Sequence, residues 1–87
     1  PITIKEDSKV ARVDLLKYLD QNNIGSRLLF AGNLTRQPYF VGKEYRVSGG
    51  LEVTDNIMNN TFWIGVYPGI DTEMLDFVAD KMTKFFE

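Results

Sequence analysis

The spacing of apolar and polar residues predicts strands and helices in alternation along the chain. Ile2 and Ile4 alternate with polar residues, as in a half-buried strand. Asp7-Ser8 offers an N-cap for a helix predicted over residues 9–22. The apolar residues of that helix recur at three- and four-residue intervals, which predicts one buried face. This face comprises Ala11, Leu15, Leu16 and Leu19.

A second strand is predicted over residues 26–31, with Leu28 and Phe30 on one of its faces. Gly32-Asn33 ends it, because both residue types tolerate left-handed backbone. Residues 34–50 show no period and are interrupted by Pro and Gly. A loop of this length in a small domain is usually functional or docked on another surface.

The last third of the chain predicts a helix, a strand and a helix. Thr54-Asp55 is the predicted cap of a short helix that ends near Asn60. Residues 61–67 are aromatic and β-branched with apolar side chains on both faces, which indicates a central strand. Asp71 is the predicted cap of a final helix over residues 72–86. The buried face of that helix is predicted to be Leu75, Val78, Met82 and Phe85.

This order of elements predicts the α+β class: a two-layer sandwich with a small, mainly antiparallel sheet and helices on one face. A length of 87 residues favours a single domain, 1–87, with a modest core. Hydrophobic residues make up 44% and charged residues 25%, as in ordinary globular proteins. The chain starts with Pro1 in mid-strand and without Met, so we expect it to be a fragment of a longer protein.

Composition excludes several kinds of site within these residues. The net charge of −2 with no basic tract argues against nucleic-acid binding. No apolar run approaches the roughly 20 residues of a membrane helix. The absence of Cys and His excludes thiolate nucleophiles, disulfides, Fe–S ligation and histidine-based catalysis, so we predict no metal site and no catalytic residue here. The lack of Cys is compatible with the cytoplasm, where we expect the protein to act.

The strongest candidate for ligand binding is the polar segment that follows the second strand. It carries Asn33, Thr35, Arg36 and Gln37, and Arg46 lies further along the same loop. Arginine pairs with phosphate through two parallel hydrogen bonds, and a glutamine side chain can bind sugar hydroxyls. The alternative is that these are ordinary solvated loop residues.

Three motifs resemble a known family. They are RLLFAGNLTRQPYF at residues 27–40, YRV at 45–47 and MNNTFWIGVYPG at 58–69. They resemble the C-terminal region of the CDP-4-keto-6-deoxy-D-glucose-3-dehydrases, the RfbH-type lipopolysaccharide biosynthesis enzymes of the DegT-type sugar aminotransferase family. The resemblance covers essentially the whole chain.

The resemblance implies the small C-terminal domain of a fold-type I enzyme that depends on pyridoxal or pyridoxamine phosphate. The parent would use pyridoxamine 5'-phosphate, an iron–sulfur cluster and a reductase partner to remove the C3 hydroxyl of a CDP-linked 4-keto-6-deoxyhexose. The products would lead to the 3,6-dideoxyhexoses of O-antigen. The missing N-terminal domain would hold both cofactors, and this chain alone would not be catalytic. Asn33, Thr35, Arg36, Gln37 and Arg46 would face the sugar nucleotide.

Two other interpretations of the residues stay open. One is a free-standing α+β module that binds or senses a small molecule. The other is a structural domain whose aromatic residues only dock a neighbouring domain or subunit. A full-length coding region with a cofactor domain upstream would favour the dehydrase, whereas a start codon at this point would favour the free module.

Overall fold

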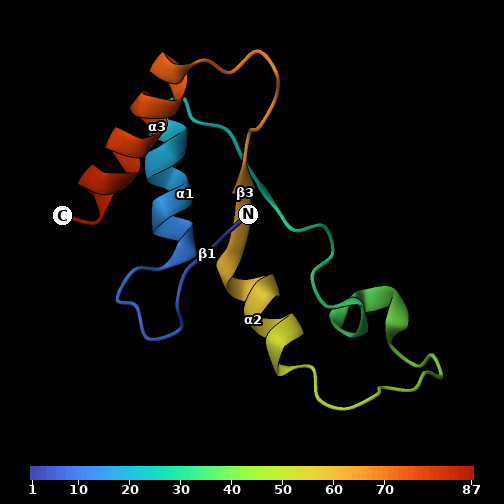
Figure 1. Ribbon diagram of the computed structural model, residues 1–87. Coiled ribbons are helices and arrows are strands. Elements are labelled where there is room, and N and C mark those ends of the chain that lie inside the picture. The colour runs from blue at the N-terminus through green and yellow to red at the C-terminus, as the bar shows by residue number, and fades with distance from the viewer.

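A computed structural model describes residues 1–87 (Figure 1). Its centre is a three-stranded antiparallel sheet in the order β1-β3-β2. The strands are β1 (Ile2–Thr3), β2 (Ser26–Leu28) and β3 (Thr61–Ile64). On β3, Phe62 lies opposite Ile2 of β1 and Leu28 of β2. The predicted antiparallel sheet and the central position of the third strand are both confirmed.

Three helices accompany the sheet: α1 (Arg12–Gln21), α2 (Glu52–Asn60) and α3 (Thr72–Phe85). In Figure 1, α1 and α3 lie side by side on one side of β3, whereas α2 lies at the end of β3 and runs into it without a loop. None of the helices has the length and apolar character needed to cross a membrane. The α+β prediction is confirmed.

The core is small and lies between α1, α3 and the sheet. Its buried apolar residues come from four segments: Ile4, Leu15, Leu19, Ile24 and Phe62. Val78, Met82 and Phe85 of α3 pack against this cluster, as their spacing predicted. Leu75 differs from its prediction, since 53% of its surface is exposed. It lies in the first turn of α3 and lines an open groove described below.

The capping residues were predicted correctly for α3 and wrongly for the other two helices. The Oδ1 atom of Asp71 accepts a hydrogen bond from the Met74 amide at 2.8 Å, as a helix N-cap does. The predicted cap at Asp7-Ser8 is wrong, because α1 begins at Arg12 and its N-cap is the exposed Ala11. Ser8 Oγ instead accepts from the Val10 amide at 3.2 Å, a local turn that competes with helix.

The predicted cap at Thr54-Asp55 is also wrong. Helix α2 begins at Glu52 after Leu51, which places Asp55 inside the first turn. Asp55 can therefore direct its carboxylate at another segment instead of at its own helix end. This displacement of the helix start creates the polar contacts of the candidate site.

Both longer strands stop earlier than predicted. Strand β2 ends at Leu28 rather than Ala31, and β3 ends at Ile64 rather than Tyr67. The register pairs Ser26 with Ile64, so β3 has no partner residue on β2 beyond that point. Phe30 has a φ of +41°, a rare conformation for a bulky residue, and turns the chain out of the sheet.

The predicted loop over residues 34–50 contains only two short 3₁₀ turns, Leu34–Arg36 and Pro38–Phe40. This segment extends away from the sheet in Figure 1 (green) and contributes to a longest dimension of 50 Å. Its aromatic rings contact one another, with centroids 4.8 Å apart for Tyr39 and Phe40 and 5.5 Å apart for Phe40 and Tyr45. The segment therefore has a small aromatic cluster of its own outside the main core.

Candidate functional site

The polar segment after β2 is docked on α2. Gly32 has a φ of +69° and faces the side chain of Met58, with an ideal Cβ at this position lying 2.7 Å from Met58 Cβ. Only glycine combines this backbone conformation with so close an approach. The contact fixes the start of the segment and brings Asn33 next to the first turn of α2.

Asn33 is the buried centre of the segment, with 3% of its surface exposed. Its Oδ1 atom accepts from the Thr35 amide at 3.0 Å and from the Thr35 hydroxyl at 2.7 Å. Its Nδ2 atom donates to Asp55 Oδ1 at 2.8 Å. Because both ends of the amide have partners, the network fixes the orientation of the side chain. Asn33 and Thr35 thus form the inner layer of the site.

Arg36 forms a bidentate ion pair with Asp55. Nε donates to Oδ1 at 2.8 Å, and Nη2 donates to Oδ2 at 2.9 Å. The hydrogen bonds from Arg36 and then from Asn33 lower the pKa of Asp55 from 3.8 to about 2. The hydrogen bond to Asp55 raises the pKa of Arg36 in turn. Both groups are therefore charged at neutral pH.

Gln37 closes the segment on itself. Its Nε2 atom donates to the carbonyl oxygen of Ala31 at 2.8 Å, whereas its Oε1 atom makes no hydrogen bond. Arg46 is exposed in the extended part of the loop and forms no hydrogen bond or ion pair. The structure thus gathers four of the five predicted residues in one segment and leaves Arg46 outside their network.

Asp55 is the member of this network that sequence reasoning missed. It lies 19 positions after Arg36, and the two meet only because α2 packs against the segment. The one signal in the sequence was an acidic residue at the start of a helix, which we interpreted as a cap. No local spacing rule could have linked it to a loop arginine.

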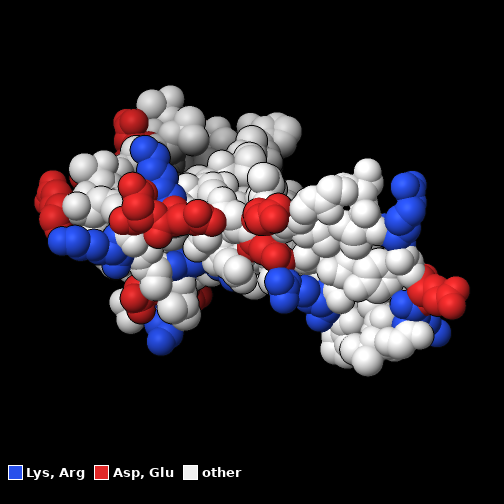
Figure 2. All heavy atoms as spheres, turned by 90° about the horizontal axis from the view of Figure 1, so that it is seen from below, with Lys and Arg blue, Asp and Glu red and all other residues white.

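The chain's residues do not fit the cofactors that the resemblance implies. An iron–sulfur cluster needs cysteine thiolates, and the chain has no cysteine. It also has no histidine to stand in place of a Schiff-base lysine. No group of three His, Cys, Asp or Glu residues is arranged to hold a metal ion. On the face in Figure 2, blue and red side chains intermingle, with no continuous basic surface.

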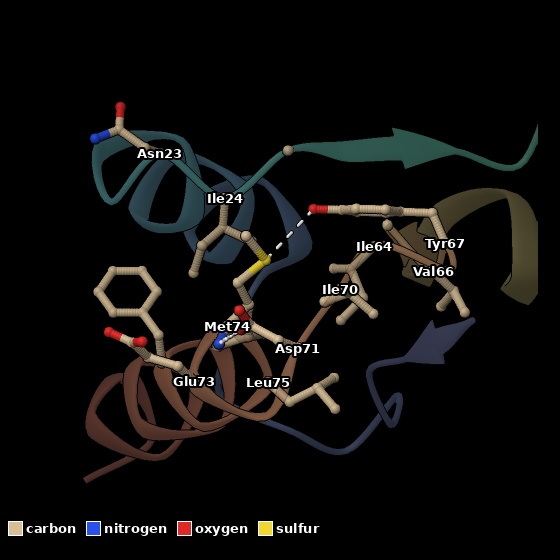
Figure 3. A pocket seen from close by; sticks show the side chains of 14 residues that line it. Asn23, Ile24, Ile64, Val66, Tyr67, Ile70, Asp71, Glu73, Met74 and Leu75 are labelled. Carbon is tan, nitrogen blue, oxygen red and sulfur yellow. Dashed lines mark hydrogen bonds between the residues drawn. The ribbon is translucent and has the colours of Figure 1, made fainter.

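A second feature is an open apolar groove of about 770 Å³ beside α3 (Figure 3). Its only charged residues are Asp71, which caps α3, and Glu73. With carboxylates and no cation, the groove does not suit a phosphate-bearing ligand. Its apolar lining is Ile24, Ile64, Val66, Tyr67, Ile70, Met74, Leu75, Phe77 and Val78.

Much of this lining is open to solvent. The exposed fraction is 89% for Val66 and 53% for Leu75, and Tyr67 directs its hydroxyl at the sulfur of Met74 across the groove (Figure 3). Contiguous apolar surface of this kind is characteristic of contact sites for another protein surface or an apolar ligand.

Comparison with known proteins assigns the family. Residues 1–83 match the DegT/DnrJ/EryC1/StrS aminotransferase family. The chain belongs to this family. Its relatives include the lipopolysaccharide biosynthesis protein RfbH of Salmonella typhimurium, 63% identical over 86 residues, or 99% of this chain and 20% of the relative. Another family relative is the dTDP-4-dehydro-2,6-dideoxy-D-glucose 3-dehydratase of Saccharopolyspora spinosa, 44% identical over 84 residues, or 97% of this chain and 18% of the relative.

These findings confirm the resemblance seen in the three motifs. The chain spans about a fifth of the length of both relatives. It is therefore similar to one part of a larger enzyme of sugar-nucleotide biosynthesis. Neither relative's name specifies a role for the segment that this chain matches.

Proposed function

We propose that this chain is the small C-terminal domain of a pyridoxamine-phosphate-dependent sugar-nucleotide 3-dehydratase. The substrate would be a CDP-linked 4-keto-6-deoxyhexose, and loss of its C3 hydroxyl would serve the synthesis of 3,6-dideoxyhexoses for O-antigen. The observation that carries this proposal is the 63% identity to a lipopolysaccharide biosynthesis protein over 99% of the chain. The 44% identity to a sugar-nucleotide 3-dehydratase supports the reaction type.

The cofactors belong to residues outside this chain, because the residues present do not fit them. Pyridoxamine 5'-phosphate, when bound, would supply the electron sink for breaking the C3–O bond. The iron–sulfur cluster and the reductase partner would serve the electron transfer that follows. We place the reaction in the cytoplasm as part of the same proposal.

The contribution of this domain would be to bind and orient the substrate at the edge of the cleft. Arg36 would offset phosphate charge, Gln37 Oε1 would accept a hydrogen bond from the sugar, and Arg46 would add a second cation from the extended loop. Asn33 and Thr35 would hold the segment in shape, since their side chains bond to each other and the Asn33 side chain also bonds to Asp55.

The apolar groove beside α3 would be covered by the rest of the enzyme. The relatives are about five times longer than this chain, so a large cofactor domain could serve as the occupant. Its contact surface would be apolar with a basic rim, because the groove carries Asp71 and Glu73 and no cation. This would bury side chains such as Val66 and Leu75.

The test of the proposal uses the full-length enzyme that contains this chain. We expect Arg36→Ala to raise the KM for the CDP-sugar by about tenfold, the effect of losing one hydrogen bond to a charged group. Gln37→Ala should raise the KM by about 2- to 10-fold, since it removes a hydrogen bond to a neutral hydroxyl. Lys84→Ala is the matched control, because it removes an exposed cation of the Asp80–Lys84 pair on α3. Unchanged KM and turnover in both loop variants would refute the role of the segment.

A free-standing module that binds a small molecule is the second candidate. The exposed Arg36 guanidinium favours it, because its bidentate pair with Asp55 forms within this chain alone. An NMR titration of the 87-residue chain with a CDP-sugar separates the two. The dehydratase proposal predicts weak or no binding to the isolated chain, whereas tight binding would support the free module.

A further inference from the structure

Arg36 keeps one of its two donor edges free. A guanidinium carries one N–H on Nε and an NH₂ group on each of Nη1 and Nη2, all in one plane. Asp55 takes the Nε hydrogen and one Nη2 hydrogen, whereas Nη1 makes no hydrogen bond and the side chain is 59% exposed. The N–H donors along the Nη1–Nη2 edge therefore remain open to a ligand from solvent.

The Asp55 carboxylate is itself held in place by Asn33. Its Oδ1 atom accepts from Asn33 Nδ2 at 2.8 Å, and Asn33 is buried with its own oxygen fixed by Thr35. The carboxylate also emerges from the first turn of α2, a rigid element. Its position sets the plane of the guanidinium, because two parallel hydrogen bonds allow only one relative orientation.

The ion pair is not needed to attach the segment to the domain. Gly32 packs on Met58, and Asn33 bonds to Asp55, independently of Arg36. An exposed ion pair of this kind adds little stability. The bidentate geometry of the Arg36–Asp55 pair is better explained as a means of orienting Arg36 than as a means of attaching the loop to the domain.

We propose that Asp55 is a positioning residue that fixes Arg36 so that its Nη1–Nη2 edge forms a bidentate site for a phosphate of the substrate's pyrophosphate. The inference rests on the proposed function for the identity of the ligand. A planar guanidinium edge matches two phosphate oxygens, which a lysine cannot do. Fixing the side chain beforehand lowers the conformational entropy lost when the phosphate binds.

A simple electrostatic role for Asp55 predicts the opposite result. If Asp55 only neutralised Arg36, replacing Asp55 would leave the positive charge of Arg36 uncompensated and would strengthen anion binding. If it orients Arg36, its removal weakens anion binding even though a nearby negative charge is lost. The sign of the change therefore separates the two roles.

The experiment is a calorimetric titration of the full-length protein containing this chain with inorganic pyrophosphate. We expect Arg36→Ala and Arg36→Lys to weaken binding by about 10- to 100-fold, as for loss of a charge-assisted pair. Asp55→Asn is expected to weaken it by about 2- to 10-fold, the effect of ordering one long side chain on binding. In the Arg36→Ala background, Asp55→Asn is expected to cause no further loss. Asp80→Asn, at another exposed ion pair, is the matched control.

Two results would overturn the inference: no pyrophosphate binding by the wild-type protein, or equal or tighter binding by Asp55→Asn. If Asp55→Asn fails to fold, as judged by circular dichroism, Asp55→Glu replaces it. Glutamate keeps the charge but displaces the carboxylate. Weaker pyrophosphate binding by Asp55→Glu, with no further loss in the Arg36→Ala background, supports a positioning role. Unchanged pyrophosphate binding by Asp55→Glu contradicts it. The titration does not depend on turnover, so an enzyme inactive on a CDP-linked 4-keto-6-deoxyhexose refutes the proposed function and leaves the pyrophosphate result standing.

Discussion

Gly32 turns the chain directly against the side chain of Met58 on α2. Its φ of +69° lies in the left-handed region, and an ideal Cβ there would lie 2.7 Å from Met58 Cβ. The position thus disfavours a larger residue for two separate reasons, backbone strain and steric overlap. The close approach sets the path of the segment that carries Asn33 and Arg36.

We predict that Gly32→Ala lowers the free energy of unfolding by about 2–4 kcal/mol, because overlap with Met58 adds to the backbone strain. Gly42→Ala is the matched control, since Gly42 has a φ of +78° and a Cβ added to it would meet no other atom within 4 Å. Gly42→Ala should lower the free energy of unfolding by about 1 kcal/mol, the effect of backbone strain alone. Urea denaturation of both variants measures the difference, and equal effects would show that Met58 moves aside freely.

Arg12 links the start of α1 to the junction of α2 and β3. Its Nη1 atom donates to the carbonyl oxygens of Met58 and Thr61 at 2.6 and 3.0 Å. We expect Arg12→Ala to destabilise the fold by about 1–3 kcal/mol, because both carbonyls lose a charged donor. Lys17→Ala, at an exposed position on the same helix, controls for loss of a cation. Similar thermal unfolding of the two variants would contradict this role.

Phe62 has no exposed surface and lies on the central strand. We predict that Phe62→Ala destabilises the protein by about 3–5 kcal/mol, the usual effect of removing a buried aromatic ring. Val53→Ala on α2 serves as the comparison, since 73% of Val53 is exposed and its removal leaves no cavity. The relative urea midpoints of the two variants measure the contribution of the core.

The pKa of Asp55 predicts a stability change in acid. Its pKa is lowered from 3.8 to about 2 in the folded protein, so the unfolded chain binds the proton more readily. The small stabilisation from this exposed ion pair is therefore fully present above about pH 4, and it is lost as the pH falls through about 2. Asp55→Asn should flatten the dependence of the urea midpoint on pH in this window. A slope unchanged from wild type, with Asp80→Asn as the charge-matched control, would contradict the assignment.

Features that depend on neighbours in sequence could be predicted. The order of elements, the Asp71 cap and the packing of Val78, Met82 and Phe85 follow from spacing and side-chain chemistry over a few residues. The central position of β3 followed from apolar residues on both of its faces. In the polar segment, four of the five predicted residues do lie together, because they are adjacent in the chain.

Features that depend on distant partners could not be predicted. Strand β3 stops at Ile64 because β2 offers no further partner, a limit that the residues of β3 do not encode. Leu75 has helical spacing but lines the open groove and is half exposed. Asp55 meets Arg36 across 19 positions, and only the packing of α2 brings them together. Whether Asn33, Thr35, Arg36, Gln37 and Arg46 contact substrate stays a prediction.

Helix α2 passes into β3 without an intervening residue, from Asn60 directly to Thr61. The segment bearing Arg36 is docked on that helix, so it is attached to an element whose backbone continues directly into the middle strand of the sheet. A loop of this size on a flexible connection would open and close independently of the domain. Here a displacement of Arg36 would have to tilt α2 or strain the joint at Thr61, so the guanidinium should move with the domain as one rigid unit.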